Sequence, residues 1–322
     1  MRGIRPVGLV LLYVGAQLVA LVLAFPFLHA GLSSTSNPNN PTDELWIIAV
    51  IVIAPLGILL VARYRGALAT LRLVLLMAIA ASLDVTFTAA LELLLPTPQF
   101  LMPYGAELVL DLAVPLAAII AVGGFLALLL EPQWYIVDTV GFIAGASLTA
   151  LLGISFGILP CFILLGALAV YDAIAVYRTK HMIRLADVVT DMKLPILMVM
   201  PDRADFDYTR APSLEQHRSA APEEREVLYM GLGDIVIPGT LVVSAFVWLP
   251  PMATAVGVGA NLLVALVAMA GSLVGYGLLM RLVAKGNAQA GLPLLNGGAL
   301  LGYIAAYLLL FHSLSLGLTV SL

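Results

Sequence analysis

Charged residues are scarce in this chain of 322 residues: Asp, Glu, Lys and Arg make up 11% of it, against about 25% in soluble domains. Cysteine is nearly absent, and the single Cys161 excludes an intrachain disulfide and a cysteine-based metal cluster. The 15 basic and 19 acidic residues give a net charge of −4, which does not favour nucleic acid as a partner. Because 62% of the residues are hydrophobic, the composition predicts an all-α polytopic membrane protein without a large water-soluble catalytic domain.

Long apolar runs bounded by proline, glycine and charge predict nine transmembrane helices. A helix needs about 20 mostly apolar residues to cross the hydrocarbon of a bilayer. The first run follows Arg2 and Arg5, but it is too long for a signal peptide and has no small-residue cleavage site, so we expect a retained helix. The predicted spans are Val7–Leu28, Leu45–Val61, Ala67–Leu94, Ala106–Leu130, Trp134–Ile154, Gly157–Tyr177, Glu226–Leu249, Ala255–Met280 and Gly291–His312.

The basic residues test this count, because a wrong number of spans would scatter them over both sides of the membrane. With nine spans and the N-terminus inside, all 15 Lys and Arg residues fall on the inner side. The predicted outer segments, around residues 35–44, 96–105, 155–156 and 250–254 and after His312, contain none. We therefore expect a multi-pass protein of the cell membrane with its N-terminus inside and its C-terminus outside.

One long hydrophilic stretch divides the chain into a six-helix part (residues 1–178), a cytoplasmic loop (179–225) and a three-helix part (226–322). Within the loop, the apolar spacing of His181–Met192 predicts an amphipathic helix at the membrane surface. Leu194–Met200 is a short apolar, strand-like segment, too short to span the membrane. The charge and low apolar content of Asp202–Arg225 predict a mobile linker.

Acidic residues within the spans are the strongest functional signal, because an ionisable group there costs several kcal/mol and usually faces the bundle interior or a watery cavity. Asp172 lies six residues before Arg178, about 9 Å from the inner edge at about 1.5 Å per residue. Asp234 lies eight residues after Glu226, about 12 Å in by the same rise. Spans six and seven are antiparallel, so we expect the two carboxylates to meet. The remaining acids are given a structural or outer-surface role: Asp84, Asp138, Glu92, Glu107 and Asp111.

Two carboxylates in a partly desolvated site share one proton, because both cannot easily ionise. The ionised acid can take a proton from water, while the other polarises a carbonyl and later protonates the leaving nitrogen. This chemistry is that of an aspartic protease and needs no metal or other cofactor. Gly231 and Gly233 would let another backbone approach Asp234 closely, and Pro238 would loosen the helix at Asp234.

The start of the last span contains many helix breakers, in the sequence Gly-Leu-Pro-Leu-Leu-Asn-Gly-Gly from Gly291 to Gly298. Pro293 lies eight residues beyond Lys285, at about the depth of the two aspartates. We expect irregular backbone here, which a membrane protein tolerates only where protein or a cavity satisfies its polar groups.

Three motifs in this order resemble the presenilin and signal peptide peptidase family of intramembrane aspartyl proteases, and more narrowly its archaeal presenilin homologues. They are Tyr171-Asp172, Gly231-Leu232-Gly233-Asp234 and Pro293-Leu294-Leu295. The resemblance implies that Asp172 and Asp234 are catalytic, supported by Tyr171, Gly231 and Gly233. It also implies that substrate contacts Leu292, Pro293, Leu294 and Leu295, although the family usually has alanine where Leu294 stands. Substrates would be transmembrane helical proteins within the lipid bilayer, and the predicted orientation is that of presenilin.

A helical substrate must unwind before its carbonyls can react. We expect Leu194–Met200 and the turn at Pro293 to offer backbone edges to the unwound segment by strand addition. A proton- or cation-coupled transporter remains the alternative, since such proteins also contain intramembrane acids and broken helices. We interpret the glycines of span eight as close helix packing, and the sequence leaves homo-oligomerisation open.

Overall fold

The computed structural model describes residues 4–318 except 34–36, 40, 63, 65, 96–98, 102–106, 110, 180–184, 189, 191, 204, 211–226, 255–256 and 284–288. Within that part of the chain, seven helices are long and apolar enough to cross a membrane. They are α1 (Ile4–His29), α3 (Ala67–Leu94), α4 (Ala113–Leu130), α5 (Trp134–Ser155), α6 (Ile158–Ile174) with its π-helical extension η1 (Ala175–Thr179), α10 (Ala260–Val283) and α11 (Leu292–Phe311). The protein is therefore a multi-pass membrane protein.

Two further apolar helices occupy the remaining predicted spans, namely α2 (Pro41–Val61) and α9 (Leu232–Trp248). The apolar part of α2 and the whole of α9 are shorter than the seven helices above. The count of nine spans and the orientation of the termini thus stay predictions.

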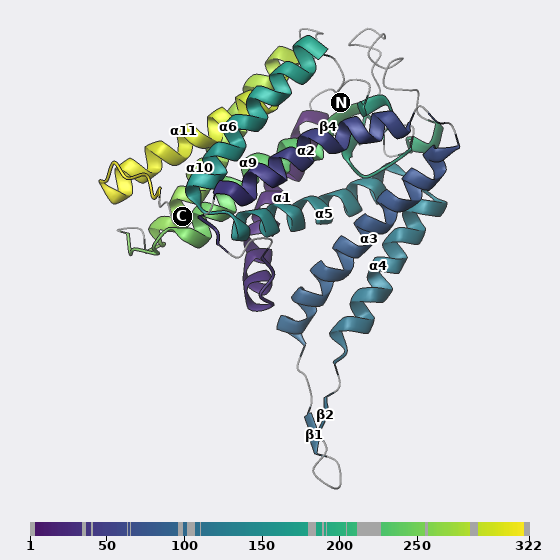
Figure 1. Cartoon of the computed structure of the whole chain (residues 1–322), viewed down its shortest axis with the longest axis horizontal. Helices are drawn as coiled ribbons and strands as arrows, with labels where there is room; N and C mark the ends of the chain where they lie inside the picture. The colour runs from purple at the N-terminus through teal and green to yellow at the C-terminus, as the bar shows by residue number, and fades with distance from the viewer. Residues whose placement is uncertain are drawn as a thin grey trace.

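The helices form a main body and a projecting arm (Figure 1). In the body, α6, α9 and α11 all contact one another, and α5 and α1 pack against α9. Buried side chains of α1, α5, α6, α9, α10 and α11 make one core. The arm is the pair α3 and α4, with a small hairpin at its far end (Figure 1). This arrangement brings together the three helices that carry the predicted site residues.

Glycines let α10 and α11 approach along much of their length. A methyl group at Gly271 would overlap the carbonyl of Gly298, and one at Gly275 would overlap the carbonyl of Leu294. Such close contact needs small residues, because in a membrane the helices associate through packing rather than through the hydrophobic effect. The packing interpretation of these two span-eight glycines is therefore confirmed.

The fourth predicted span begins too early. Two strands, β1 (Gln99–Leu101) and β2 (Glu107–Val109), pair as an antiparallel hairpin with Phe100 opposite Leu108. The helix α4 starts only at Ala113, whose N–H donates to the Asp111 carboxylate (2.9 Å). This bond satisfies the amide of the first helical residue, which has no acceptor within the helix.

The seventh predicted span also begins too early, because its first residues form a strand. β4 (Val227–Gly231) pairs antiparallel with β3 (Leu197–Pro201), with Met198 opposite Met230. Both segments are rich in Val, Leu, Met and Tyr, and each supplies the other's backbone hydrogen bonds. Helix α9 therefore starts at Leu232 and Asp234 lies in its first turn, so the depth calculated from Glu226 does not hold.

Part of the predicted mobile linker is anchored. Tyr208 is fully buried in a second core formed with α3, α4 and α5, and it begins the short 3-10 helix η2 (Tyr208–Arg210). Its N–H donates to the side chain of Gln133 (3.3 Å), and the Lys193 ammonium lies 4.3 Å from its ring centre. Burial of the Tyr208 ring therefore holds this charged segment against the helices. The rest of the predicted linker, residues 211–226, lies outside the described residues. Of the predicted surface helix, residues 185–188 are helical.

Candidate active site

Asp172 lies in the last turn of α6, where the helix passes into the wider π-helical turn of η1. Its side chain is buried, with 8% of its surface exposed. The carboxylate Oδ2 accepts a hydrogen bond from the backbone N–H of Leu292 (3.1 Å). Leu292 is the first residue of α11, so its N–H has no acceptor within the helix, and the positive end of the helix dipole points at the acid.

Asp234 lies in the first turn of α9, directly after the strand β4, and is half-buried. A Cβ atom built on Gly291 would lie 2.9 Å from its Oδ1 and 3.2 Å from its Oδ2. Asp234 is also within electrostatic range of Asp172. The two backbone units Gly291 and Leu292 therefore lie against both carboxylates, and they bring together acids that are 62 positions apart in the sequence.

The first turn of α11 is helical, so the irregular backbone expected between Gly291 and Gly298 is wrong. Pro293 lies at the start of the helix, where its missing N–H would have had no partner and its fixed φ suits a helix. Leu292 and Leu295 are buried, whereas Pro293 and Leu294 are partly exposed. Of the four predicted substrate-binding residues, those two are the ones whose side chains are accessible.

The glycines before Asp234 are not required by a close approach of another described backbone, although Gly231 pairs with Leu197 of β3. A Cβ atom at Gly231 would lie 3.4 Å from Asp234 Oδ2, an ordinary contact, and one at Gly233 would meet no described atom within 4 Å. Gly233 is exposed, so within the described part of the chain the acid has space on this side. Pro238 lies inside α9, which continues through it to Trp248.

Tyr177, which the sequence analysis did not select, holds the chain just before Gly291. Its hydroxyl donates to Gln289 Oε1 (2.9 Å) and accepts the N–H of Ala290 (3.2 Å). Tyr177 follows Asp172 by five positions, so one turn of π-helix brings both side chains toward the start of α11. Tyr171 lies beside Asp172, partly buried against the main core.

Asn296 fastens the same end of α11 to α6. Its buried amide donates to the carbonyl of Leu165 (2.8 Å). Together with the bond from Leu292 to Asp172, this gives two links between α11 and α6, whose residues lie one helical turn apart on α11 and about two turns apart on α6. The position of Gly291 between the acids is thus fixed by its neighbours on both sides.

Two acids thus lie at the junction of three helices. A protein-family comparison matches nearly the whole of the chain that carries them. The model of the family described as signal-peptide peptidase, presenilin aspartyl protease matches residues 9–311. The chain belongs to this family. Its members are intramembrane aspartyl proteases.

Solved structures agree with this membership. The presenilin-family chain is 32% identical to a presenilin family intramembrane aspartate protease solved in the C222 space group, with a TM-score of 0.64 over 94% of this chain and 98% of that one. A structure described in the same words in the P2 space group gives 32% identity and a TM-score of 0.62 over 94% and 97% of the two chains. No curated protein matches the chain.

The other interior acids of this presenilin-family protein lie apart from the pair. Asp138 is buried in α5 and accepts the N–H of Val199 in β3 (2.7 Å). Asp84 lies in α3, and its Oδ1 is buried without a partner among the described residues. Glu107 belongs to β2, and Glu92 borders a small cavity near His29 at the end of α1. Neither Asp138 nor Asp84 joins Asp172 and Asp234.

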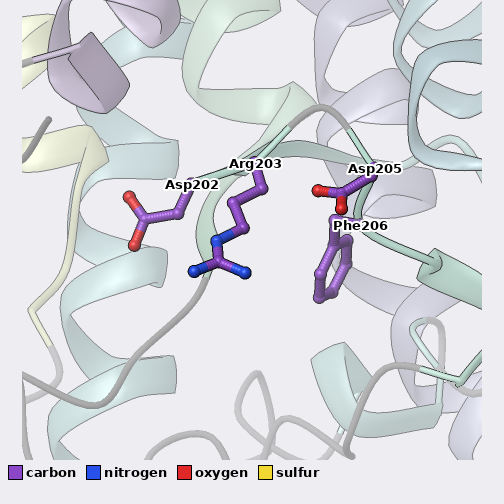
Figure 2. Close-up of a pocket in the computed structure, with 4 residues that line it drawn as sticks. All are labelled: Asp202, Arg203, Asp205 and Phe206. Atoms are coloured by element: carbon purple, nitrogen blue, oxygen red, sulfur yellow. The ribbon is translucent and has the colours of Figure 1, made fainter.

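The molecule also has a polar cavity of about 390 Å³ on the loop that follows β3. Figure 2 shows that Asp202 and Asp205 flank Arg203 there, with the ring of Phe206 at one side. Neither Asp172 nor Asp234 is among its described lining residues. We therefore place the candidate site of this protease-family member at the carboxylates and not at the cavity.

Proposed function

We propose that Asp172 and Asp234 are the catalytic pair of a GxGD-type intramembrane aspartyl endopeptidase, which hydrolyses peptide bonds within or near transmembrane segments of its substrates. The observation that carries the proposal is the contact of Gly291 and Leu292 with both carboxylates. This contact places two acids from different helices against one short piece of backbone, at the start of a helix. No metal or other cofactor is needed for the reaction.

In the proposed mechanism the two acids share one proton. The ionised carboxylate takes a proton from a water molecule, which attacks the substrate carbonyl, while the protonated acid donates a hydrogen bond to the carbonyl oxygen. The proton then passes to the leaving nitrogen as the peptide bond breaks. The Leu292 N–H and the N-terminus of α11 stabilise negative charge on Asp172 during this cycle.

The substrate reaches the acids from the side of Gly233, where a Cβ atom would meet no described atom. An unwound substrate segment adds as a strand to the outer edge of β4, which runs directly into the turn that carries Asp234. This modifies the expected role of Leu194–Met200, because β4 and the Asp138 carboxylate already occupy the two sides of β3. Pro293 and Leu294 lie near enough in sequence to Leu292 to contact the substrate beside the acids.

The deciding experiment uses the purified protein in a bilayer with a single-pass helical substrate. The intact protein is compared with Asp172→Ala and Asp234→Ala, and the products are identified by mass spectrometry. We expect cleavage by the intact protein and none by either variant. If the intact protein cleaves nothing but carries ions across the bilayer, the transporter alternative replaces the protease.

Proline scanning tests strand addition separately. Tyr229 is opposite Val199, whose N–H points away from β4 to Asp138. Residue pairs in an antiparallel ladder alternate between hydrogen-bonded and non-hydrogen-bonded, so these two form a non-hydrogen-bonded pair and the N–H of Tyr229 points to the outer side of β4. Tyr229→Pro therefore removes an outer amide and keeps the β3–β4 hydrogen bonds. We expect it to abolish cleavage, while Tyr229→Ala, which keeps the amide, retains it. Equal activity of the two variants would contradict strand addition.

We also propose the topology of nine spans, with residues 1–178 and 226–322 as its six-helix and three-helix parts, the loop 179–225 and the N-terminus inside, and the C-terminus outside the cell membrane. The distribution of the 15 basic residues supports it. The only native cysteine, Cys161, is buried, so single cysteines placed in the loop and at the C-terminus can be labelled from one side of intact cells. Labelling of both from the same side would refute the proposed topology.

A further inference from the structure

A buried acid outside the catalytic pair holds one edge of the small sheet. Asp138 lies in the second turn of α5 with 5% of its side chain exposed. Its Oδ1 accepts the backbone N–H of Val199, at 2.7 Å and across 61 positions of sequence. Its Oδ2 is buried and has no partner among the described residues. A carboxyl group in this position is costly in a membrane helix, so its retention needs a reason.

Helix α5 is shaped to reach this edge of the sheet. Gly141 lies three residues after Asp138, on the same face of the helix. A Cβ atom there would lie 3.1 Å from the carbonyl oxygen of Pro195, just before β3. The absence of a side chain at Gly141 lets the helix come close enough for Asp138 to reach Val199. The hydrogen bond between Asp138 and Val199 therefore depends on the close approach of α5 to β3.

The position of Val199 is transmitted to the catalytic acid through a short series of hydrogen bonds. Val199 is opposite Tyr229, and the pairing continues to Leu197 opposite Gly231. The next residue, Leu232, donates its N–H to the carbonyl of Ile196 (2.9 Å) and begins α9. Asp234 follows two residues later, so a shift of β3 along the sheet would move the first turn of α9.

We propose that Asp138 is a positioning residue: by holding the Val199 amide it fixes the register of β3 and β4, and so sets where Asp234 and the adjoining strand edge meet the substrate. The inference rests on the proposed function of the site, because it concerns the position of the cut. Asp138 acts through its acceptor oxygen and takes no part in proton transfer. It differs in this from Asp172 and Asp234, which lie against the start of α11.

Three variants of the full-length protein in a bilayer test the proposal. Asp138→Asn keeps an acceptor oxygen of the same shape, Asp138→Leu removes it, and Thr149→Val is the matched control. Thr149 is also buried in α5, but its hydroxyl bonds only to the Gly145 carbonyl of its own helix in the described contacts. The readouts are kcat/KM, the cleavage positions by mass spectrometry, and hydrogen exchange of the Val199 amide.

We expect Asp138→Asn and Thr149→Val to stay within about threefold of the intact protein in kcat/KM and to cut at the same position. We expect Asp138→Leu to lose at least about tenfold in kcat/KM and to cut at additional positions. We also expect its Val199 amide to exchange at least about tenfold faster, since the hydrogen bond that protects this amide is lost. A single unchanged cleavage position in Asp138→Leu, or an Asp138→Asn protein as inactive as Asp138→Leu, overturns the proposal.

If Asp138→Leu does not fold, a second variant removes the donor of the same hydrogen bond instead of the acceptor. Val199→Pro removes the donor and leaves the β3–β4 bonds in place, because that amide points away from β4. It should give the same additional cleavage positions, and a single native cut would refute the positioning role. The exchange measurement needs no substrate. If the intact protein cuts nothing, the proposed function fails. If the Val199 amide exchanges as slowly in Asp138→Leu as in the intact protein, the role of Asp138 is refuted.

Discussion

A methyl group added at Gly291 should disable the site without unfolding the protein. In Gly291→Ala the new Cβ would lie 2.9 Å from Asp234 Oδ1 and 3.2 Å from both Cγ and Oδ2, whereas ordinary contacts begin at 3.4 Å. The backbone at Gly291 is already right-handed helical, with φ −79° and ψ −48°, so alanine adopts it without strain. The carboxyl group of Asp234 must therefore move by about 0.5 Å to reach 3.4 Å, or α11 must move away from Asp172.

The expected loss can be worked from this overlap. Crowding of a well-packed site costs about 1–3 kcal/mol, and each 1.36 kcal/mol at the transition state is a factor of about 10 in rate. We expect kcat/KM for a helical substrate to fall by about 5-fold to 150-fold. Displacement of a reacting group by about 1 Å can reach the upper end by itself.

The matched control lies in α11, the helix that Gly291 precedes. Gly297→Ala adds a methyl group where no described atom lies within 4 Å, so it should leave cleavage unchanged and stabilise α11 by up to about 1 kcal/mol. Both variants are measured for substrate cleavage and for thermal unfolding in the same lipid. A Gly291→Ala protein that retains at least half of the cleavage rate refutes the placement of Gly291 against Asp234.

Three more outcomes follow from the geometry. Tyr177→Phe loses hydrogen bonds to the chain before Gly291, each worth about 0.5–1.5 kcal/mol, and should lower kcat/KM several-fold with little change in the unfolding temperature. Gly298→Leu would push against Gly271 and should lower the unfolding temperature by several degrees, which calorimetry would show. Hydrogen bonds from the Thr209 hydroxyl and then from Gln133 hold the pKa of the partly exposed Asp207 below its ordinary value of 3.8. These contacts stabilise the loop above pH 3.8 and are lost as the pH falls through the lower folded-state pKa; carboxyl NMR of Thr209→Val should show that pKa rise toward 3.8.

The sequence analysis located the long helices well, because a membrane span is set by one dominant quantity, the length of an apolar run. Seven of the predicted spans correspond to helices long enough to cross a membrane. Span eight also begins later than predicted, at Ala260, and the larger errors lie at two other helix starts, Ala113 and Leu232. In both places apolar residues precede the helix, and hydropathy does not distinguish a strand from the first turns of a helix.

The candidate site was only partly predictable. Asp172 and Asp234 were found because a buried acid in a membrane is unusual, and because their motifs resemble a family. Gly291 was seen as a helix breaker, and its contact with Asp234 depends on how α11 packs against α6 and α9. Tyr177 had a weaker signal, since only the π-helical turn brings its hydroxyl to the chain before α11. Contacts between distant segments are set by packing geometry, which periodicity does not contain.

The bond between Leu292 and Asp172 joins residues 120 positions apart, which has a consequence for biosynthesis. During translation α6 is made and inserted well before α11. The carboxylate of Asp172 therefore lacks the hydrogen bond from the Leu292 amide while the later spans are still being made. A partly inserted chain can hold both acids and still lack the backbone that sets them side by side. On the proposed function, proteolysis therefore begins only when the last helix has docked, and neighbouring membrane proteins are protected from an immature enzyme.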